Sequence, residues 1–184
     1  MNHNEVQGLI KQFNYYRLLG EKSFAQVPDE KLFLQYNAES NSIATIVKHL
    51  WGNMMSRWTD LLNSDGEKEW RNRDGEFEND ITSREEMMKK WNEGWDCLFN
   101  SLNSLKSEDM EKLIYIRNMG QTVQEAIDRQ LSHYPYHIGQ IVYISRMHAG
   151  AKWENLSIPK GRSQEYNKDK FEKPKQTQHF TDEL

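Results

Sequence analysis

Two histidines stand four residues apart in the stretch QLSHYPYHIGQIVYI, residues 130–144. Residues at this spacing on an α-helix lie on one face, about 6 Å apart along the axis, so His133 and His137 can bind the same metal ion. Imidazole is a ligand for zinc, nickel, copper or iron. Two histidines that pack in a core or cap a helix would have the same spacing, so the pair alone leaves both interpretations open.

A candidate third ligand lies in the segment SIATIVKHLWGNMMSRWTD, residues 42–60. His49 borders the apolar stripe of this segment, whose period is that of an α-helix. The same flank continues, about one turn at a time, through Asn53, Arg57 and Asp60. The pattern predicts a polar seam along the edge of an otherwise apolar helix face.

Pro135 stands between the two histidines of the first stretch. Proline inside a helix removes one backbone hydrogen bond, here to the carbonyl of Leu131, and bends the helix. Such a bend would change the relative direction of His133 and His137. Two explanations remain open: the bend adjusts the distance between two ligands, or it fits the helix to its neighbours.

Four segments that must position these residues have the apolar periodicity of helices. They run from about residue 4 to 26, from 43 to 62, from 83 to 102 and from 122 to about 148. The last two open with the spacing of a capping box, Ser83 with Glu86 and Thr122 with Glu125. Because each segment is apolar on one face only, we expect an all-α fold, a four-helix bundle.

The connections between the predicted helices are unequal in length. About 20 residues join the second helix to the third and a similar number join the third to the fourth, and such long crossovers permit neighbours that are not sequential. The stretch LIYIRNMGQT, ahead of the fourth helix, predicts a short extended pair. Residues 1–159 are expected to form the bundle, and residues 160–184 a loosely held polar tail.

The composition excludes several classes of protein. The chain of 184 residues has 24 Lys and Arg against 28 Asp and Glu, a net charge of -4, so it lacks the basic excess that binds nucleic acid. No apolar run reaches the roughly 18 residues of a membrane span. Cys97 is the single cysteine, which rules out an internal disulfide and favours a cytoplasmic location. We expect it to be a buried structural residue.

The segments ATIVKHLWGNM (residues 44–54) and LSHYPYHIGQIVYI (residues 131–144) resemble the DinB/YfiT-like superfamily. Members of that superfamily are four-helix bundles that bind a divalent metal ion through one histidine of the second helix and two of the fourth. The resemblance implies His49, His133 and His137 as the ligands. Gly139 and Gln140, which follow His137, match a common HxGQ ending.

Other segments resemble a branch of this superfamily that is known mainly as a domain of unknown function. They are GNMMSRWTDLLNSDGEKEWRNRD (residues 52–74) and ENLSIPKGRSQEYN (residues 154–167), and the resemblance covers about residues 5–167. The superfamily often forms dimers, so the resemblance implies a homodimer.

Three histidine ligands leave a divalent ion with an open coordination position, as in catalytic sites. We therefore expect a metal-dependent enzyme, with zinc or nickel as the first candidates. Relatives in the superfamily include bacillithiol S-transferases and mycothiol-dependent isomerases, which implies transfer of a low-molecular-weight thiol to a small electrophile; hydrolysis is the other possible reaction. The alternative is a non-catalytic metal-binding or stress-response protein.

Candidates for contact with a small-molecule substrate follow His49 in the chain. They are Asn53, Arg57, Asp60, Arg71 and Arg73. The arginines could bind the carboxylates of a peptide-like thiol in bidentate fashion. The competing interpretation, which we favour, is a loop held by Trp58 and Trp70, with the arginines in salt bridges.

Overall fold

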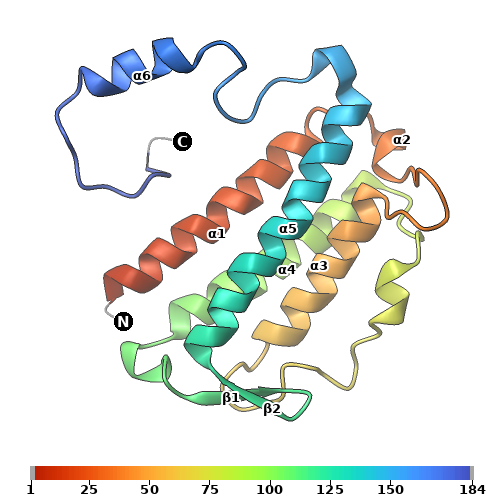
Figure 1. The fold of residues 1–184 in the computed structure, drawn as a ribbon. Helices are drawn as coiled ribbons and strands as arrows, with labels where there is room; N and C mark the ends of the chain where they lie inside the picture. The colour runs from red at the N-terminus through yellow and green to blue at the C-terminus, as the bar shows by residue number, and fades with distance from the viewer. Residues whose placement is uncertain (1–2, 183–184) are drawn as a thin grey trace.

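Four long helices form the body of the structure, a computed structural model that describes residues 3–182. They are α1 (His3–Phe24), α3 (Ile43–Trp58), α4 (Arg84–Ser104) and α5 (Val123–Ala149), and they lie side by side (Figure 1). The short elements are α2 (Asp29–Leu32), α6 (Ser163–Phe171) and the 3-10 turns η1 (Asp74–Phe77), η2 (Ser107–Asp109) and η3 (Gly150–Lys152). The expectation of a mostly helical chain is confirmed.

The helices pack in an order that differs from their order in the chain. The most extensive contacts join α3 to α4 and α1 to α5, and further contacts join α3 to α5 and α1 to α4. Helix α3 therefore lies beside α5, although α4 separates them in sequence. The packing of α3 against α5 brings the three histidines together, because His49 lies on α3 and His133 and His137 lie on α5.

The core between the helices is strongly aromatic. Phe13, Trp91, Trp95 and Tyr134 are among the largest fully buried side chains. The Tyr134 ring contacts both Phe13 and Trp95, with centroids 5.9 and 6.0 Å apart. Met87, Trp91 and Trp95 of α4 belong to this core. Among the helices of the described chain, none has the length and apolar character needed to cross a bilayer.

The helix starts follow from their capping residues. Thr122 and Glu125 form the reciprocal capping box that the sequence predicts. Ser83 accepts a hydrogen bond from the backbone of Glu86, but within the described residues Glu86 does not return one. The Ser83 motif is therefore a simple N-cap.

Helix α3 ends earlier than its apolar stripe suggests. The stripe continues to Leu61 and Leu62, whereas the helix ends at Trp58. Asp60 adopts a φ of 49°, a left-handed conformation that cannot continue an α-helix. Leu61 is nevertheless buried, so a turn can bury the same apolar side chain as a helix.

A small hairpin precedes α5, so the chain is not purely α-helical. Strands β1 (Leu113–Ile116) and β2 (Met119–Thr122) pair antiparallel in the stretch predicted to be extended. The turn residues Arg117 and Asn118 both have positive φ, and the carboxylate of Asp65 accepts a hydrogen bond from each of their backbone N–H groups, at 2.9 Å. The hairpin is thereby attached to the connection between α3 and α4.

The C-terminal segment is mostly exposed and includes a helix, α6, within the predicted polar tail. In Figure 1, α6 stands away from the long helices, and the described residues that follow it return toward α1. Lys11 of α1 forms an ion pair with Asp182, at 2.6 Å, and the rings of Tyr15 and Phe180 are 5.5 Å apart. These contacts lie on the surface of the molecule.

Candidate metal centre

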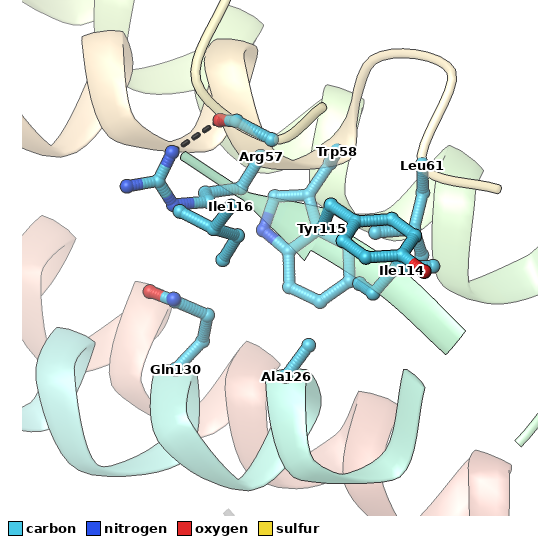
Figure 2. Close-up of a pocket in the computed structure, with 9 residues that line it drawn as sticks. Arg57, Trp58, Leu61, Ile114, Tyr115, Ile116, Ala126 and Gln130 are labelled. Atoms are coloured by element: carbon cyan, nitrogen blue, oxygen red, sulfur yellow. Dashed lines mark hydrogen bonds between the residues drawn. The ribbon is translucent and has the colours of Figure 1, made fainter. Parts of the chain in front are cut away.

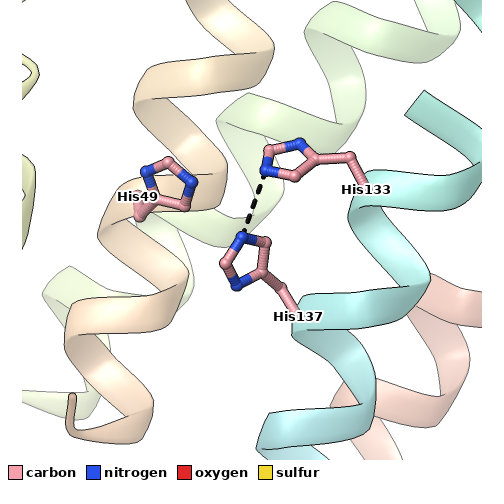
Figure 3. A group of neighbouring side chains, drawn as sticks. All are labelled: His49, His133 and His137. Atoms are coloured by element: carbon pink, nitrogen blue, oxygen red, sulfur yellow. Dashed lines mark hydrogen bonds between the residues drawn. The ribbon is translucent and has the colours of Figure 1, made fainter. Parts of the chain in front are cut away.

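The three predicted ligands meet at the interface between α3 and α5 (Figure 3). One nitrogen from each of His49, His133 and His137 lies within 4.8 Å of the others. The ring centroid of His137 is 4.8 Å from that of His49 and 4.8 Å from that of His133. Helix α5 continues through Pro135, so the two α5 histidines remain one turn apart on a single helix.

Each α5 histidine has one nitrogen held by a glutamine of the same helix. The Nδ1 atom of His133 is 3.1 Å from Oε1 of Gln130, and that of His137 is 3.0 Å from Oε1 of Gln140. Because an amide oxygen only accepts hydrogen bonds, each Nδ1 carries the ring proton. The Nε2 atom of each ring is left with a free lone pair.

The two Nε2 atoms face each other at 3.1 Å (Figure 3). Two lone pairs at this distance repel each other unless a cation or a proton lies between them. Nitrogens about 2.1 Å from one metal ion, at coordination angles of about 90 to 110°, are about 3.0 to 3.4 Å apart. The observed separation therefore fits two ligands of one ion.

The electrostatic environment keeps both α5 imidazoles neutral. Burial lowers the pKa of His133 to about 3, and the neighbouring His137 and His49 add to this effect. Burial likewise lowers the pKa of His137 to about 4. Burial acts in this direction because it disfavours the charged form. Both rings are thus in the form that binds metal at pH 7.

His49 has a carboxylate partner. Its Nδ1 atom donates to Oε2 of Glu76, at 2.9 Å, and its ring stacks on Phe77, with the centroids 4.9 Å apart. Glu76 lies in η1 and is 3% exposed. Burial alone would raise the pKa of Glu76, but the hydrogen bonds from His49 and Arg71 outweigh it and lower the pKa, so the carboxylate is ionised.

Two of the arginines proposed for substrate contact are buried in ion pairs. Arg71 donates to Glu76 from Nε and Nη2, at 2.7 and 2.9 Å. Arg57 and Arg71 both donate to Oε2 of Glu67, at 3.0 and 3.1 Å. Arg57 and Arg71 are therefore in salt bridges, as the competing interpretation of this loop expects.

The other three candidates have different surroundings. Asn53 accepts a hydrogen bond from the buried Tyr134 hydroxyl, at 3.1 Å, and faces the core. Asp60 lies beyond the end of α3 and is exposed, where it accepts from Asn63. Arg73 is exposed, with its guanidinium 5.4 Å above the Phe77 ring that stacks on His49. Of the five, Arg73 is the exposed one that contacts the aromatic ring stacked on His49.

A small cavity lies between the end of α3, the hairpin and α5, close to the histidine partners (Figure 2). Arg57 and Gln130 point into it from α3 and α5, and its other walls are mainly the apolar side chains of Trp58, Leu61, Ile114, Ile116 and Ala126. Nη1 of Arg57 donates to the carbonyl of Gly66, whereas its buried Nε has no partner within the described chain. The cavity has room for about one water molecule, too little for a substrate.

Sequence reasoning missed the partners of the histidines. Gln130 and Gln140 each lie three residues from a histidine on the same helix, and this spacing could have indicated the contacts. Glu76 lies 27 residues after His49, in a connection without apolar periodicity. No local pattern points to it.

Comparison with known proteins places the chain in a family. No curated protein and no solved structure has significant similarity to it. Residues 1–162 match the sequence model of the family described as "Protein of unknown function (DUF1572)". This match covers the four long helices and all three histidines. The chain therefore belongs to the DUF1572 family.

Proposed function

We propose that the protein is a metal-dependent enzyme that holds one divalent ion through His49, His133 and His137. The arrangement of the ring nitrogens carries this proposal. Each Nδ1 is held by an acceptor, and the free Nε2 atoms of His133 and His137 face each other at 3.1 Å. With both ring protons on Nδ1, the two Nε2 lone pairs repel each other at this distance, and a cation between them would remove the repulsion.

Three neutral ligands leave the full charge of a divalent ion uncompensated. Such an ion, for which zinc and nickel are the first candidates, would act as a Lewis acid and lower the pKa of a bound water or thiol. The protein contributes rings that are fixed in direction and kept neutral by burial. The proposed reaction is attack of a low-molecular-weight thiol or of water on a small electrophile, that is, S-transfer or hydrolysis.

The substrate contact is proposed for Arg73. Arg57 and Arg71 are occupied by Glu67 and Glu76. Arg73 is exposed and lies over Phe77, the ring that stacks on His49, and we propose that it binds a carboxylate of the thiol.

The fold proposed for this site is a four-helix bundle of the DinB/YfiT-like type. Its support is the packing of four long helices with the ligands on α3 and α5. A homodimer and a cytoplasmic location complete the proposal; light scattering of the purified protein tests the first, and fractionation of cells tests the second.

A non-catalytic metal-binding protein is the second candidate. One observation favours it: Glu76, the carboxylate beside the histidines, is fully engaged by His49 and Arg71 and cannot act as a general base. Turnover would then depend entirely on the nucleophile bound to the ion.

The first test of the proposal is metal content. Elemental analysis should find one divalent ion per wild-type chain and a loss of this ion in the His137→Ala variant. Full metal content in His137→Ala would contradict the assignment of the ligands.

The second test distinguishes the reactions. Addition of a small thiol to the cobalt-substituted protein should produce a sulfur-to-metal charge-transfer band if the thiol enters the coordination sphere. If no thiol at millimolar concentration changes the spectrum while cobalt remains bound, S-transfer is wrong. Hydrolase assays then decide between hydrolysis and the non-catalytic function.

A further inference from the structure

We propose that Glu76 is a positioning residue that fixes His49 for the metal ion, and that Arg71 in turn fixes Glu76. This inference rests on the proposed metal centre. It assigns a role to a carboxylate and an arginine that do not themselves touch the ion.

The contact with Glu76 selects one form of the His49 ring. A carboxylate that is ionised can only accept, so the 2.9 Å hydrogen bond places the ring proton on Nδ1 and leaves Nε2 free to bind the ion. His133 and His137 have neutral amide partners instead. A charged acceptor holds the ring more firmly in this orientation than a neutral amide does.

Arg71 prevents Glu76 from turning away from His49. Its guanidinium meets both carboxylate oxygens, with Nε 2.7 Å from Oε1 and Nη2 2.9 Å from Oε2. This two-point contact restricts rotation of the carboxylate. The side chains of Arg71 and Glu76 are 2% and 4% exposed, so water does not compete for these bonds.

The ion-pair network is anchored on α3 at both ends. From Arg71 it continues to Glu67, at 3.1 Å, and from Glu67 to Arg57, at 3.0 Å. Arg57 lies eight residues after His49 on the same helix. The connection that contains Glu76 is therefore held against α3 at two points, His49 and Arg57.

Gly52 is the independent sign that the carboxylate must approach α3 this closely. A Cβ atom at position 52 would lie 2.2 Å from Oε1 and 2.6 Å from Cδ of Glu76. Both distances are far below van der Waals contact, and Arg71 holds the carboxylate in place. Any residue other than glycine would push Glu76 away from His49. Gly52→Ala is therefore a way to displace the carboxylate without changing any charge.

The test compares the metal affinity of three variants with that of the wild type, by competition with a chelator for zinc. Glu76→Gln removes the charge, and Gly52→Ala displaces the carboxylate. Glu78→Gln is the matched control, because it removes the same charge from an exposed side chain two residues away. We expect Glu76→Gln and Gly52→Ala each to weaken zinc binding by about 10- to 100-fold. Glu78→Gln should have the affinity of the wild type.

A second measurement reads the His49 ring directly. Long-range proton–nitrogen NMR correlations of the metal-free wild type should show the proton of His49 on Nδ1. The inference is overturned if that proton lies on Nε2, or if Glu76→Gln binds zinc as tightly as the wild type. Melting curves of the metal-free variants separate a loss of folding from a loss of affinity.

The outcomes also separate this inference from the proposed function. If the wild type binds no divalent metal, the proposed function and the metal role of Glu76 both fail. If the wild type binds zinc and Glu76→Gln binds it equally well, only the role of Glu76 fails.

Discussion

The connection between α3 and α4 and the C-terminal segment are both polar and rich in charge, but they differ in what their charges contact. In the connection, residues 59–82, Glu76 and Arg71 form an ion pair whose side chains are 4% and 2% exposed. In the C-terminal segment, residues 160–182, the Lys11–Asp182 pair is 45% and 34% exposed. The two segments contain similar numbers of charged residues, so that number alone does not show which of them buries an ion pair.

The difference shows that burial, not the number of charges, decides what an ion pair contributes. A surface pair competes with water and is worth about 0 to 1 kcal/mol. Removal of one partner from a buried pair leaves an uncompensated charge and costs about 3 to 5 kcal/mol. The connection should therefore depend on its ion pairs for its position beside His49, whereas the C-terminal segment should not affect the site.

The largest expected effect is that of Arg71→Met. This change leaves Glu76 and Glu67 without their shared partner in a buried site, so we expect the free energy of unfolding to fall by about 3 to 5 kcal/mol. Urea denaturation of the metal-free protein measures it. A loss below about 1 kcal/mol would mean that the connection behaves like the surface segment.

The next effect is stabilisation by metal. A ligand that binds only the folded state at about 100 times its dissociation constant raises the free energy of unfolding by about 2.7 kcal/mol. We expect this increase when zinc is added to the wild type, and none in His137→Ala. Thermal denaturation with and without zinc measures it. Equal stabilisation of His137→Ala would place the bound ion elsewhere in the protein.

A smaller effect is the pH dependence of the metal-free protein. The folded-state pKa values of His133 and His137, about 3 and about 4, lie below the unfolded value near 6.5, so the unfolded chain binds protons first as the pH falls. The contribution of the two neutral histidines to the free energy of unfolding should be fully present above about pH 6.5. It should decrease as the pH falls from about 6.5 to 4.

The control for this pH dependence is the double variant His133→Gln with His137→Gln. It lacks both titrating groups, so its stability should change less than that of the wild type between pH 7 and pH 5. Urea denaturation at several pH values compares the two. Identical pH profiles would contradict the burial of neutral histidines at this site.

The smallest expected effect concerns the C-terminal segment. Lys11→Ala removes the exposed ion pair with Asp182, so the free energy of unfolding should change by less than about 1 kcal/mol. Zinc affinity should be that of the wild type. A loss of zinc affinity in Lys11→Ala would show that the C-terminal segment influences the metal centre after all.

The features that the sequence predicted well depend on local geometry. The apolar period indicated the four long helices, and the spacing of His133 and His137 indicated that they share a face of one helix. Both follow from the rise and turn of the α-helix, which neighbouring residues determine. The hairpin before α5 was also predicted from a local stretch.

The end of α3 shows where local pattern is misleading. Leu61 and Leu62 continue the apolar stripe, yet the left-handed conformation of Asp60 ends the helix at Trp58. This turn lets the following residues run beside the hairpin, where the Gly66 backbone N–H donates to the Tyr115 carbonyl at 2.8 Å. The turn combines local hydrogen bonds to Asp60 with this contact to a segment far away in the chain, and the apolar stripe indicates neither of them.

The sequence by itself determined that the chain is mostly helical and which three histidines are able to share an ion. The tertiary structure alone decided which charged residues of the connection support them. Glu76 and Arg71 are buried beside His49 because the connection folds back along α3 and Gly52 leaves room for the carboxylate. Arg73, two residues from Arg71, remains exposed. An irregular segment has no repeating geometry that relates the spacing of residues to the direction of their side chains. Only the folded path of the connection therefore decides which of its charged residues are buried beside the site and which are exposed to solvent.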